Sequence, residues 1–388
     1  MSKQTYLNRK TLKTYSRLSL WLVAVFVLTF TVAGITLRLF SHADTAPAGM
    51  RSLPDPLYGV TVDDVSNISN IIASSQHFSH MPITRVVFDE NTTPSDYTAA
   101  ISSLQPYTYL MGEILDSAYM NTLTLQQYHD RTAAFLSAFG NQVDLWEVGN
   151  EVNGDWTGAY SDVAAKITDA YHQVVAAGKR SELTLYYNPN NCDGSSELDP
   201  INFTNQYVPA DMRSGLNYVT ISYYETQCNN YRPTAATLTS FFQQLHALYP
   251  NAKLGFGEIG LPNAAATSTL AQAQDIAAYY YGLNINLPYY IGGYFYWYYY
   301  EDALPYATKS MWQTLNTAFT NMPSNSGSPS PSPSPTKTGD LNGDGAVNIF
   351  DLSILLSRWG TADASADLNH DGTVNIFDLS ELLSNWTG

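Results

Sequence analysis

The sequence predicts an α/β protein with two folded parts: a (β/α)8 TIM barrel of eight parallel strands with intervening helices, and a small all-α domain at the C-terminus. Three observations predict this arrangement. Strand-like and helix-like stretches alternate through residues 44–321, a Ser/Pro-rich run follows at residues 322–339, and the segment after it repeats with a period of 27 residues. With 388 residues and 45% hydrophobic content, the chain can bury one large core and one small one.

The N-terminus has the pattern of an export signal. Basic residues precede an apolar run from Leu18 to Leu37, no acidic residue precedes Asp44, and the small residues Ser41 and Ala43 suit a cleavage site. The run is long for a signal peptide and long enough to span a bilayer, so residues 1–43 are predicted to be a signal peptide or a signal anchor. Because positive charge precedes the run, the rest of the chain is expected to be extracellular, secreted or attached to the cell surface.

The mature chain is strongly acidic. From Asp44 on, 12 basic residues face 34 acidic ones, a net charge of −22. Such a surface repels nucleic acid and anionic membranes, so neither is expected as a partner, whereas neutral sugars meet no electrostatic penalty.

The two cysteines, Cys192 and Cys228, do not have the spacing of a metal site. An exported chain meets an oxidising environment, which favours a disulfide between them; two unpaired buried thiols are the alternative.

The predicted barrel is based on eight short apolar runs bounded by turn residues. The expected strands are Tyr58–Val62, Arg85–Phe88, Tyr107–Met111, Leu145–Gly149, Thr184–Tyr187, Tyr218–Tyr223, Lys253–Phe256 and Gly293–Trp297. Helical patterns lie between most of them, for example at Leu125–Phe139, Asp162–Ala177, Leu238–Leu248 and Leu270–Leu283. A doubly wound open sheet is the main alternative, but no G-x-G-x-x-G or P-loop follows any strand, which removes the usual nucleotide role of such a sheet.

Two glutamates follow strand-like runs in similar contexts. Glu151 lies in Trp146-Glu-Val-Gly-Asn-Glu-Val152, and Glu258 lies in Gly255-Phe-Gly-Glu-Ile-Gly260. The active site of such a barrel lies at the C-terminal ends of its strands. A pair of carboxyl groups there suits the cleavage of a glycosidic bond, with one group as acid and the other as nucleophile or base. For either glutamate alone, a helix-capping or ion-pairing role is the alternative; the other strand-end acids are Asp89, Glu90, Glu113, Asp116 and Glu225.

This placement after the fourth and seventh strands, with Asn150 directly before the first glutamate, resembles clan A of the glycoside hydrolases over residues 55–320. The resemblance implies that Glu151 is the general acid/base, that Glu258 is the nucleophile and that Asn150 binds the sugar 2-hydroxyl. It also implies retention of the anomeric configuration, for which carboxyl groups about 5 Å apart are suited.

Three aromatic residues extend the predicted site. The resemblance implies that Tyr224, after the sixth strand, hydrogen-bonds the nucleophile, with Tyr223 as the alternative. It also implies that Trp297, at the end of the eighth strand, forms a sugar platform. Trp156, in the loop after the fourth strand, is a further sugar-binding candidate because aromatic faces stack on sugars. Two positions depart from the pattern: Ser222 stands where many relatives have His, and Arg85 begins its strand, whereas the clan's nucleophile-contacting Arg ends it.

The C-terminal repeat has the ligand pattern of calcium loops: oxygens at alternate positions, a Gly at the sharp turn and a closing carboxylate. The first loop offers Asp340, Asn342, Asp344, the carbonyl of Ala346, Asn348 and Asp351, and the second offers Asp367, Asn369, Asp371, the carbonyl of Thr373, Asn375 and Asp378. We therefore expect two calcium ions in this domain. For catalysis we expect no cofactor. Plain polar turns are the alternative.

The closing Asp, in place of the Glu of the usual helix–loop–helix calcium hand, matches the dockerin module, which residues 340–388 resemble. The resemblance implies docking onto a cohesin-bearing scaffold protein. Ile376-Phe377 and its copy Ile349-Phe350 occupy positions where dockerins commonly contact their partner, although small hydroxyl residues are more usual there. A module that folds on calcium without a scaffold partner is the alternative.

The sequence thus predicts a retaining endo-β-glycanase that acts on an extracellular polysaccharide, with its catalytic domain at residues 44–321. A linker at residues 322–339 joins it to a dockerin-like domain at residues 340–388. The alternative function is a non-catalytic carbohydrate-binding barrel displayed on a scaffold or the cell surface.

Overall fold

The computed structural model describes residues 50–261, 269–323, 338–339, 341, 347, 349–363, 366–369 and 371–387. The predicted export signal at residues 1–43 and most of the predicted linker lie outside these ranges. Within them, no helix has the length and apolar character needed to cross a membrane.

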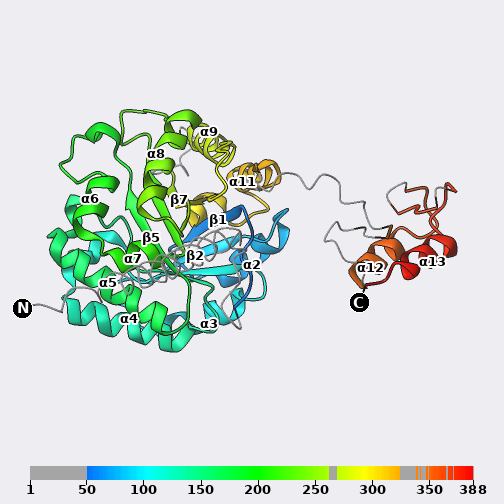
Figure 1. Ribbon diagram of the computed structural model, residues 1–388, viewed down its shortest axis with the longest axis horizontal. Coiled ribbons are helices and arrows are strands. Elements are labelled where there is room, and N and C mark those ends of the chain that lie inside the picture. Colours follow the sequence, from blue (N-terminus) through cyan, green and yellow to red (C-terminus); the bar gives the residue numbers. More distant parts are fainter. Residues whose placement is uncertain are drawn as a thin grey trace, which may run out of the picture.

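Eight parallel strands close into a barrel, and each strand pairs with its neighbours in chain order until β8 closes on β1 (Figure 1). The strands are β1 (Leu57–Val62), β2 (Ile83–Val87), β3 (Tyr109–Glu113), β4 (Leu145–Glu147), β5 (Ser181–Tyr186), β6 (Tyr218–Tyr223), β7 (Lys253–Ile259) and β8 (Tyr290–Tyr296). The predicted barrel is confirmed, and the open sheet is excluded.

Helices surround the barrel and connect its strands (Figure 1). They are α2 (Ile68–His77), α3 (Pro94–Leu104), α4 (Leu125–Phe139), α5 (Tyr160–Ala176), α6 (Pro200–Tyr207), α7 (Ala210–Gly215), α8 (Ala235–Leu248), α9 (Leu270–Tyr281), α10 (Tyr299–Ala303) and α11 (Ser310–Asn321). Short 3₁₀ turns occupy the loops after β3, β4 and β5: η1 (Ser117–Thr122), η2 (Asp155–Thr157) and η3 (Pro189–Asn191). The bounds of α4 are those predicted. Thr124 and Gln127 form a capping box that stabilises its start.

Two strand boundaries differ from the prediction in ways that matter for the site. β2 begins at Ile83, so Arg85 is the middle residue of the strand and not its first. β7 continues through Glu258 to Ile259, beyond the predicted end at Phe256. Both errors come from reading polar residues as strand ends, whereas the interior of this barrel is itself polar at that level.

The barrel interior changes character along its axis. Seven apolar residues, most of them at the N-terminal ends of their strands, form one buried cluster: Leu57, Ile83, Met111, Leu145, Tyr218, Ile291 and Phe295. Buried polar and charged residues lie further along the strands, among them Arg85, Glu113, Glu147, Glu182 and Thr220. A separate, larger apolar core lies between the strands and the surrounding helices.

The C-terminal part contains two short helices, α12 (Ile349–Ser357) and α13 (Ile376–Ser384). Its buried core among the described residues is small: Val347, Leu355, Ala366, Val374 and Leu382. Domains with so little apolar core generally need a metal ion or cross-links for stability.

Candidate active site

A pocket of about 610 Å³ lies at the C-terminal end of the barrel, and both predicted catalytic glutamates line it. The residues that line it are Glu151, Trp156, Tyr186, Asp193, Tyr224, Gln227, Glu258 and Tyr298. This volume is within the range of sites for small ligands.

Glu151 reaches the pocket from a turn directly after β4. The hydrogen-bond ladder with β5 continues past the strand, from Val148 N–H to the Glu182 carbonyl (2.9 Å) and from Thr184 N–H to the Gly149 carbonyl (3.0 Å). The backbone then turns sharply, and Glu151 has a φ of +44°, which is rare for a residue with a side chain. Such strained residues are typical of functional sites.

The surroundings of Glu151 favour its protonated form. Burial raises the pKa of its carboxyl well above the ordinary value, and the nearby charges of Glu258 and Asp116 act in the same direction. The Ser117 hydroxyl donates a hydrogen bond to Oε2 (3.1 Å), which opposes this shift. A carboxyl of this kind is suited to donate a proton near neutral pH.

Glu258 faces the barrel interior because of a bulge in β7. Phe256 points outward, where its ring packs against Phe242 of α8 and Tyr280 of α9. By the two-residue period of a strand, Glu258 would point outward too. The register with β6 shifts between Phe256 and Glu258, which turns the glutamate inward. Gly257 permits this shift, because a Cβ there would lie 2.2 Å from the Thr220 hydroxyl.

Glu258 is held by three neighbours. Arg85 Nη1 donates to Oε2 (2.8 Å), the Tyr224 hydroxyl donates to Oε1, and Asn150 Nδ2 lies 3.5 Å from Oε2. Burial raises the pKa of the Glu258 carboxyl, while Arg85 and Tyr224 oppose the rise by stabilising the charged form. The two glutamates therefore differ: only Glu258 has a guanidinium partner.

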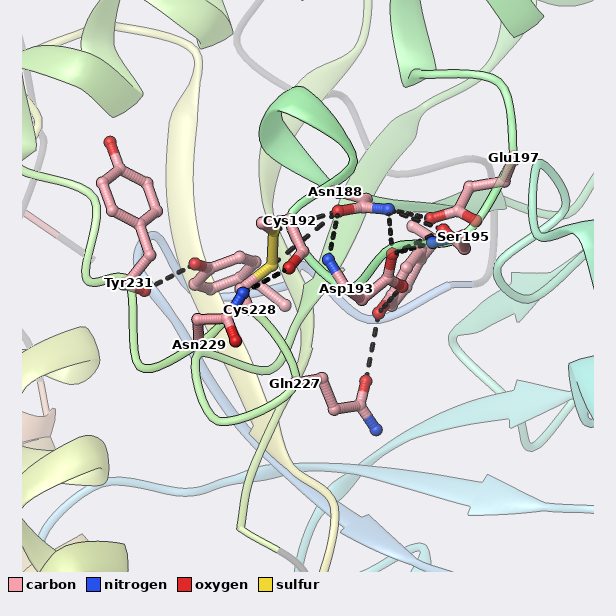
Figure 2. Close-up of a disulfide and its surroundings, with 11 residues drawn as sticks. Asn188, Cys192, Asp193, Ser195, Glu197, Gln227, Cys228, Asn229 and Tyr231 are labelled. Carbon is pink, nitrogen blue, oxygen red and sulfur yellow. Dashed lines mark hydrogen bonds between the residues drawn. A yellow bond between two sulfur atoms is a disulfide. The ribbon is translucent and has the colours of Figure 1, made fainter.

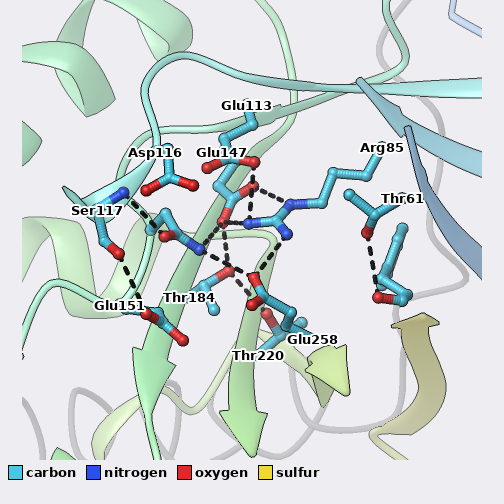
Figure 3. Close-up of polar contacts among 12 residues, drawn as sticks. Thr61, Arg85, Glu113, Asp116, Ser117, Glu147, Glu151, Thr184, Thr220 and Glu258 are labelled. Carbon is cyan, nitrogen blue, oxygen red and sulfur yellow. Dashed lines mark hydrogen bonds and ion pairs between the residues drawn. The ribbon is translucent and has the colours of Figure 1, made fainter. Parts of the chain in front are cut away.

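Arg85 joins three strands from the centre of the barrel (Figure 3). Its guanidinium forms a two-pronged ion pair with Glu147, with Nε–Oε2 and Nη2–Oε1 distances of 2.7 and 2.9 Å. A Glu113 oxygen lies 3.1 Å from Nη2, and Nη1 bonds Glu258. All of these side chains except Glu258 are fully buried. A planar, always-charged fork is suited to a site of this kind.

One guanidinium does not neutralise all of the carboxyl groups around it. Burial raises the pKa of Glu113 well above its ordinary value, and Arg85 only partly opposes this. Burial and the charge of Glu147 likewise raise the pKa of Glu182, whose Oε1 accepts from the hydroxyls of Thr184 and Thr220. Both groups therefore favour the neutral acid, so the interior keeps few charges at neutral pH.

Ser117, the first residue of η1, connects three residues of the predicted site. Its hydroxyl bonds Glu151 and accepts from Trp156 Nε1 (3.1 Å), while its N–H donates to Asn150 Oδ1 (3.1 Å). Neither Ser117 nor Arg85 was among the predicted site residues. A serine after a strand has no distinctive sequence signal, and the position of Arg85 was obscured by the strand boundary.

The predicted site residues come together with two differences: Asn150 approaches Glu258 (3.5 Å) without lining the pocket, and Trp297 does not line it either. Glu151, Glu258, Tyr224 and Trp156 line the pocket. Arg85 stacks on the Trp297 ring, with a guanidinium-to-centroid distance of 5.3 Å, and the next residue, Tyr298, lines the pocket in its place. Among the rival acids, a Glu113 oxygen lies 3.1 Å from Arg85, and Glu225 forms an ion pair with Arg232 (2.7 Å), so both contact an arginine.

All six predicted ligand residues of the second calcium loop lie within the described residues. Its oxygens come from Asp367, Asn369, Asp371, the carbonyl of Thr373, Asn375 and Asp378, a donor set that suits a hard cation. Gly372, at the sharp turn, has a φ of +92°. The buried Asp378 carboxylate accepts from the N–H groups of Leu368 (2.7 Å) and Asn375 (2.7 Å). Across the described ranges, no three acidic, His or Cys side chains form a ready metal cluster.

Most of the first predicted calcium loop lies outside the residues that the structure describes. Asp340, Asn342, Asp344, Ala346 and Asn348 lie outside the described residues. Its closing residue, Asp351, is buried and accepts from the Leu341 N–H (2.8 Å), as Asp378 accepts from Leu368 N–H in the second loop. The two closing carboxylates thus have equivalent backbone contacts.

Comparison with known families gives a match over this segment: residues 338–385 match the dockerin type I domain. The chain carries a dockerin domain. The match covers both predicted calcium loops, so the predicted resemblance is confirmed for this part. No curated protein matches the chain in sequence.

Solved structures similar to the barrel are glycoside hydrolases by their descriptions. A GH10 xylanase from Bispora sp. MEY-1 has 12% identity and a TM-score of 0.47, over 68% of this chain and 96% of its own. The major endoglucanase of Xanthomonas campestris pv. campestris has 13% identity and a TM-score of 0.45, over 69% of this chain and 96% of its own. At these values the comparison does not decide the reaction of this chain.

Replacing Arg85 with Met should destabilise the barrel by about 3–5 kcal/mol at pH 7, because it leaves buried carboxylates without a partner. Loss of the guanidinium raises the carboxyl pKa values in the folded state. The loss in free energy of unfolding should therefore be largest at neutral pH, and it should shrink as the pH falls and the carboxyl groups become protonated. Urea unfolding at several pH values measures this. Lys253→Met is the control, since Lys253 pairs with Asp55 (3.3 Å) where both side chains are partly exposed, and the variant should cost about 1 kcal/mol or less. Equal losses in the two variants would contradict the role of Arg85.

Replacing Ser117 with Ala should raise the pKa of Glu151 further, because the variant removes a hydrogen bond that stabilises the carboxylate. Titration of the side-chain carboxyl by carbon-13 NMR measures the shift. Ser214→Ala is the control, since that hydroxyl bonds carbonyls of its own helix, α7. A Glu151 titration curve that is the same in both variants would exclude the contact.

Proposed function

We propose that the barrel is a glycoside hydrolase that cleaves β-linked bonds of an extracellular polysaccharide with retention of configuration. The observation that carries the proposal is the unequal treatment of two carboxyl groups in one pocket. Glu258 is bonded by Arg85 and Tyr224, which favour its charged form, whereas Glu151 is buried beside the charge of Glu258 and favours its protonated form. Burial raises the pKa of both carboxyls, but only at Glu258 do a guanidinium and a phenol oppose the rise. A carboxyl pair with pKa values kept apart in this way can supply the acid and the nucleophile of a glycosidase.

In the proposed first step, a Glu258 oxygen attacks the anomeric carbon of the bound sugar. The bond from this carbon to the glycosidic oxygen breaks, and Glu151 gives its proton to that oxygen, so that the leaving sugar departs as an alcohol. In the second step the ionised Glu151 takes a proton from water, and the water oxygen displaces Glu258 from the anomeric carbon. Glu151 ends protonated and Glu258 ends ionised, as both began.

Asn150 and the aromatic residues would position the sugar. Asn150 Oδ1 is fixed by the Ser117 N–H, which aims its amide nitrogen at the Glu258 side of the pocket. An amide donor there can bond a sugar hydroxyl next to the reacting carbon. Trp156 and Tyr298 supply aromatic surface on the pocket walls, which suits the apolar faces of sugars.

Assays of the full chain on polysaccharides test this function. The full chain, incubated with a panel of β-linked polysaccharides, should release reducing sugar from at least one of them, and proton NMR of the first product should show the anomeric configuration of the substrate. Inverted product would contradict retention. Binding of a polysaccharide without any release of reducing sugar would instead favour the non-catalytic carbohydrate-binding barrel.

We also propose that the dockerin domain attaches the barrel to a cohesin-bearing scaffold, and that residues 1–43 direct export and are cleaved or retained as an anchor. Dockerin domains bind calcium, and the repeat suggests two ions in this one. The proposed domain limits, at residues 44–321 and 340–388, are compatible with the end of α11 at Asn321 and the start of the family match at residue 338.

Changing the two glutamates should have unequal effects. Glu258→Ala should abolish turnover of every substrate, because no glycosyl intermediate can form. The activity of Glu151→Ala on polysaccharide should fall at least about a hundredfold. Its activity on aryl glycosides should remain, because their leaving groups need no protonation. In the parent chain, activity should fall as the pH rises through the Glu151 pKa, and this alkaline limb should be absent in Glu151→Ala. Steady-state kinetics against pH measure both effects. Glu90→Gln, another strand-end carboxyl outside the pocket, is the control; similar small losses in all three variants would contradict the assigned roles.

Removing calcium should unfold the dockerin domain and leave the barrel intact, because three Asp side chains in the second loop repel one another without a cation. Hydrogen exchange of the full chain with and without a calcium chelator should show loss of protection in α13 and none in α4. Asp378→Ala should abolish the calcium response, whereas Glu381→Gln on the same helix should keep it. Unchanged protection of α13 after chelation would contradict this prediction.

A further inference from the structure

One wall of the pocket is built from two loops that a disulfide joins. Cys192, in the loop after β5, is bonded to Cys228, in the loop after β6, with a Cα–Cα distance of 4.7 Å (Figure 2). Asp193 directly follows the first cysteine and Gln227 directly precedes the second. Both of these polar residues line the pocket. The cross-link therefore fixes the spacing of two pocket residues and not only of the loops.

The two loops have little regular structure of their own to hold these residues. Four asparagines in them adopt positive φ angles between +50° and +59°: Asn190, Asn191, Asn229 and Asn230. Besides the disulfide, Asn229 Nδ2 donates to the Cys192 carbonyl across the loops (2.8 Å). Ordering long loops before a ligand arrives removes part of the entropy cost of binding.

Asp193 keeps one carboxylate oxygen directed to its own loop and one to the pocket wall. Oδ1 accepts from the Ser195 N–H (2.9 Å) and from Asn188 Nδ2 (2.6 Å). Oδ2 accepts from the Tyr186 hydroxyl at the longer distance of 3.3 Å. Burial acts to raise the pKa of Asp193, but the hydrogen bonds from Ser195 and Asn188 outweigh it and lower the pKa. Asp193 is therefore a charged acceptor with spare capacity on Oδ2.

Gln227 supplies the complementary donor. Its Oε1 lies 3.0 Å from the same Tyr186 hydroxyl and shares its single proton with Asp193 Oδ2, which leaves the two N–H bonds of the exposed amide to face a ligand. A sugar hydroxyl both donates and accepts, so it can bond a carboxylate and an amide at once. Trp156 packs edge-on against Tyr186, with ring centroids 5.1 Å apart, and adds aromatic surface beside this pair.

The charge of the pocket indicates which sugars can occupy it. The residues that line it include three carboxyls, Glu151, Glu258 and Asp193, and no Lys or Arg. A uronic acid would bring a further negative charge to these groups without a cation to pair it, and like charges at close range oppose binding. A neutral sugar meets only hydrogen-bonding partners.

We infer that Asp193 and Gln227 form a hydroxyl-binding subsite, held in place by the Cys192–Cys228 disulfide, that selects neutral sugar units over uronic acids. The inference rests on the proposed glycosidase function. The subsite lies on the Glu151 side of the pocket, because Trp156 reaches Glu151 through the Ser117 hydroxyl. Its residues position the substrate and take no part in the chemistry, so their loss should appear in KM and not in kcat.

The test uses the full chain and the polysaccharide that it hydrolyses best, with the carboxymethylated form of the same polymer as the charged competitor. Asp193→Asn should raise KM on the neutral polymer about tenfold, the effect of one lost charged hydrogen bond, with kcat kept within about twofold. It should also reduce the preference for the neutral polymer. Gln227→Ala should raise KM and leave the preference unchanged, because it alters no charge. Asn230→Gly, in the same loop but outside the pocket, is the matched control, since glycine adopts its φ of +57° without strain.

The disulfide is tested separately with Cys192→Ser/Cys228→Ser, assayed well below its own melting temperature. This double variant should raise KM as the two single variants do. Unchanged KM in Asp193→Asn and Gln227→Ala would overturn the subsite while leaving the glycosidase proposal in place. If the parent chain hydrolyses no polysaccharide, the glycosidase proposal fails, and calorimetric binding of neutral oligosaccharides then decides the subsite: equal affinity in the parent and in Asp193→Asn would overturn it.

Discussion

The buried guanidinium of Arg85 is the interaction on which the rest of the site depends. It bonds Glu147 and Glu258 and lies within 3.1 Å of Glu113, and of these groups only Glu258, at the pocket, has any exposure to solvent. A single fixed positive charge can keep only some of its neighbours ionised, and burial drives the remainder toward the neutral acid. The protonation states that the proposed chemistry needs thus depend on burial and on which carboxyl group the guanidinium contacts.

Delivery of the two glutamates to one pocket requires two departures from regular structure. Glu151 stands at a left-handed backbone position after β4, and Glu258 is turned inward by the bulge at Gly257 in β7. Each departure is supported by its surroundings: the ladder to β5 continues up to the turn, and the missing side chain of Gly257 leaves room for the Thr220 hydroxyl. Local strain at a site is stable where the neighbouring structure fixes it in this way.

The sequence was sufficient for the barrel, because alternating strand and helix patterns need no information about distant contacts. It also indicated Glu151, Glu258, Tyr224 and Trp156, whose local contexts are distinctive. It did not reveal the role of Arg85, since a two-residue error in the start of β2 placed the guanidinium at the wrong end of the barrel. The exchange of Trp297 for Tyr298 on the pocket wall had the same origin: the end of β8 decides which aromatic ring faces in, and strand ends depend on pairing between distant segments.

The strands of the barrel and the loops that follow them therefore have different roles in the site. Strands β2, β4 and β7 hold Arg85, Glu147 and Glu258, and loss of the guanidinium would leave buried carboxylates unpaired, so this layer tolerates little change. The loops after β5 and β6 carry Asp193 and Gln227, which face solvent and can change without disturbing that balance. The Cys192–Cys228 bond and the hydrogen bond from Asn229 to the Cys192 carbonyl hold these loops together. Ion pairs inside the barrel therefore hold Glu258, and a cross-link outside the barrel holds one wall of the pocket. These two constraints can vary independently.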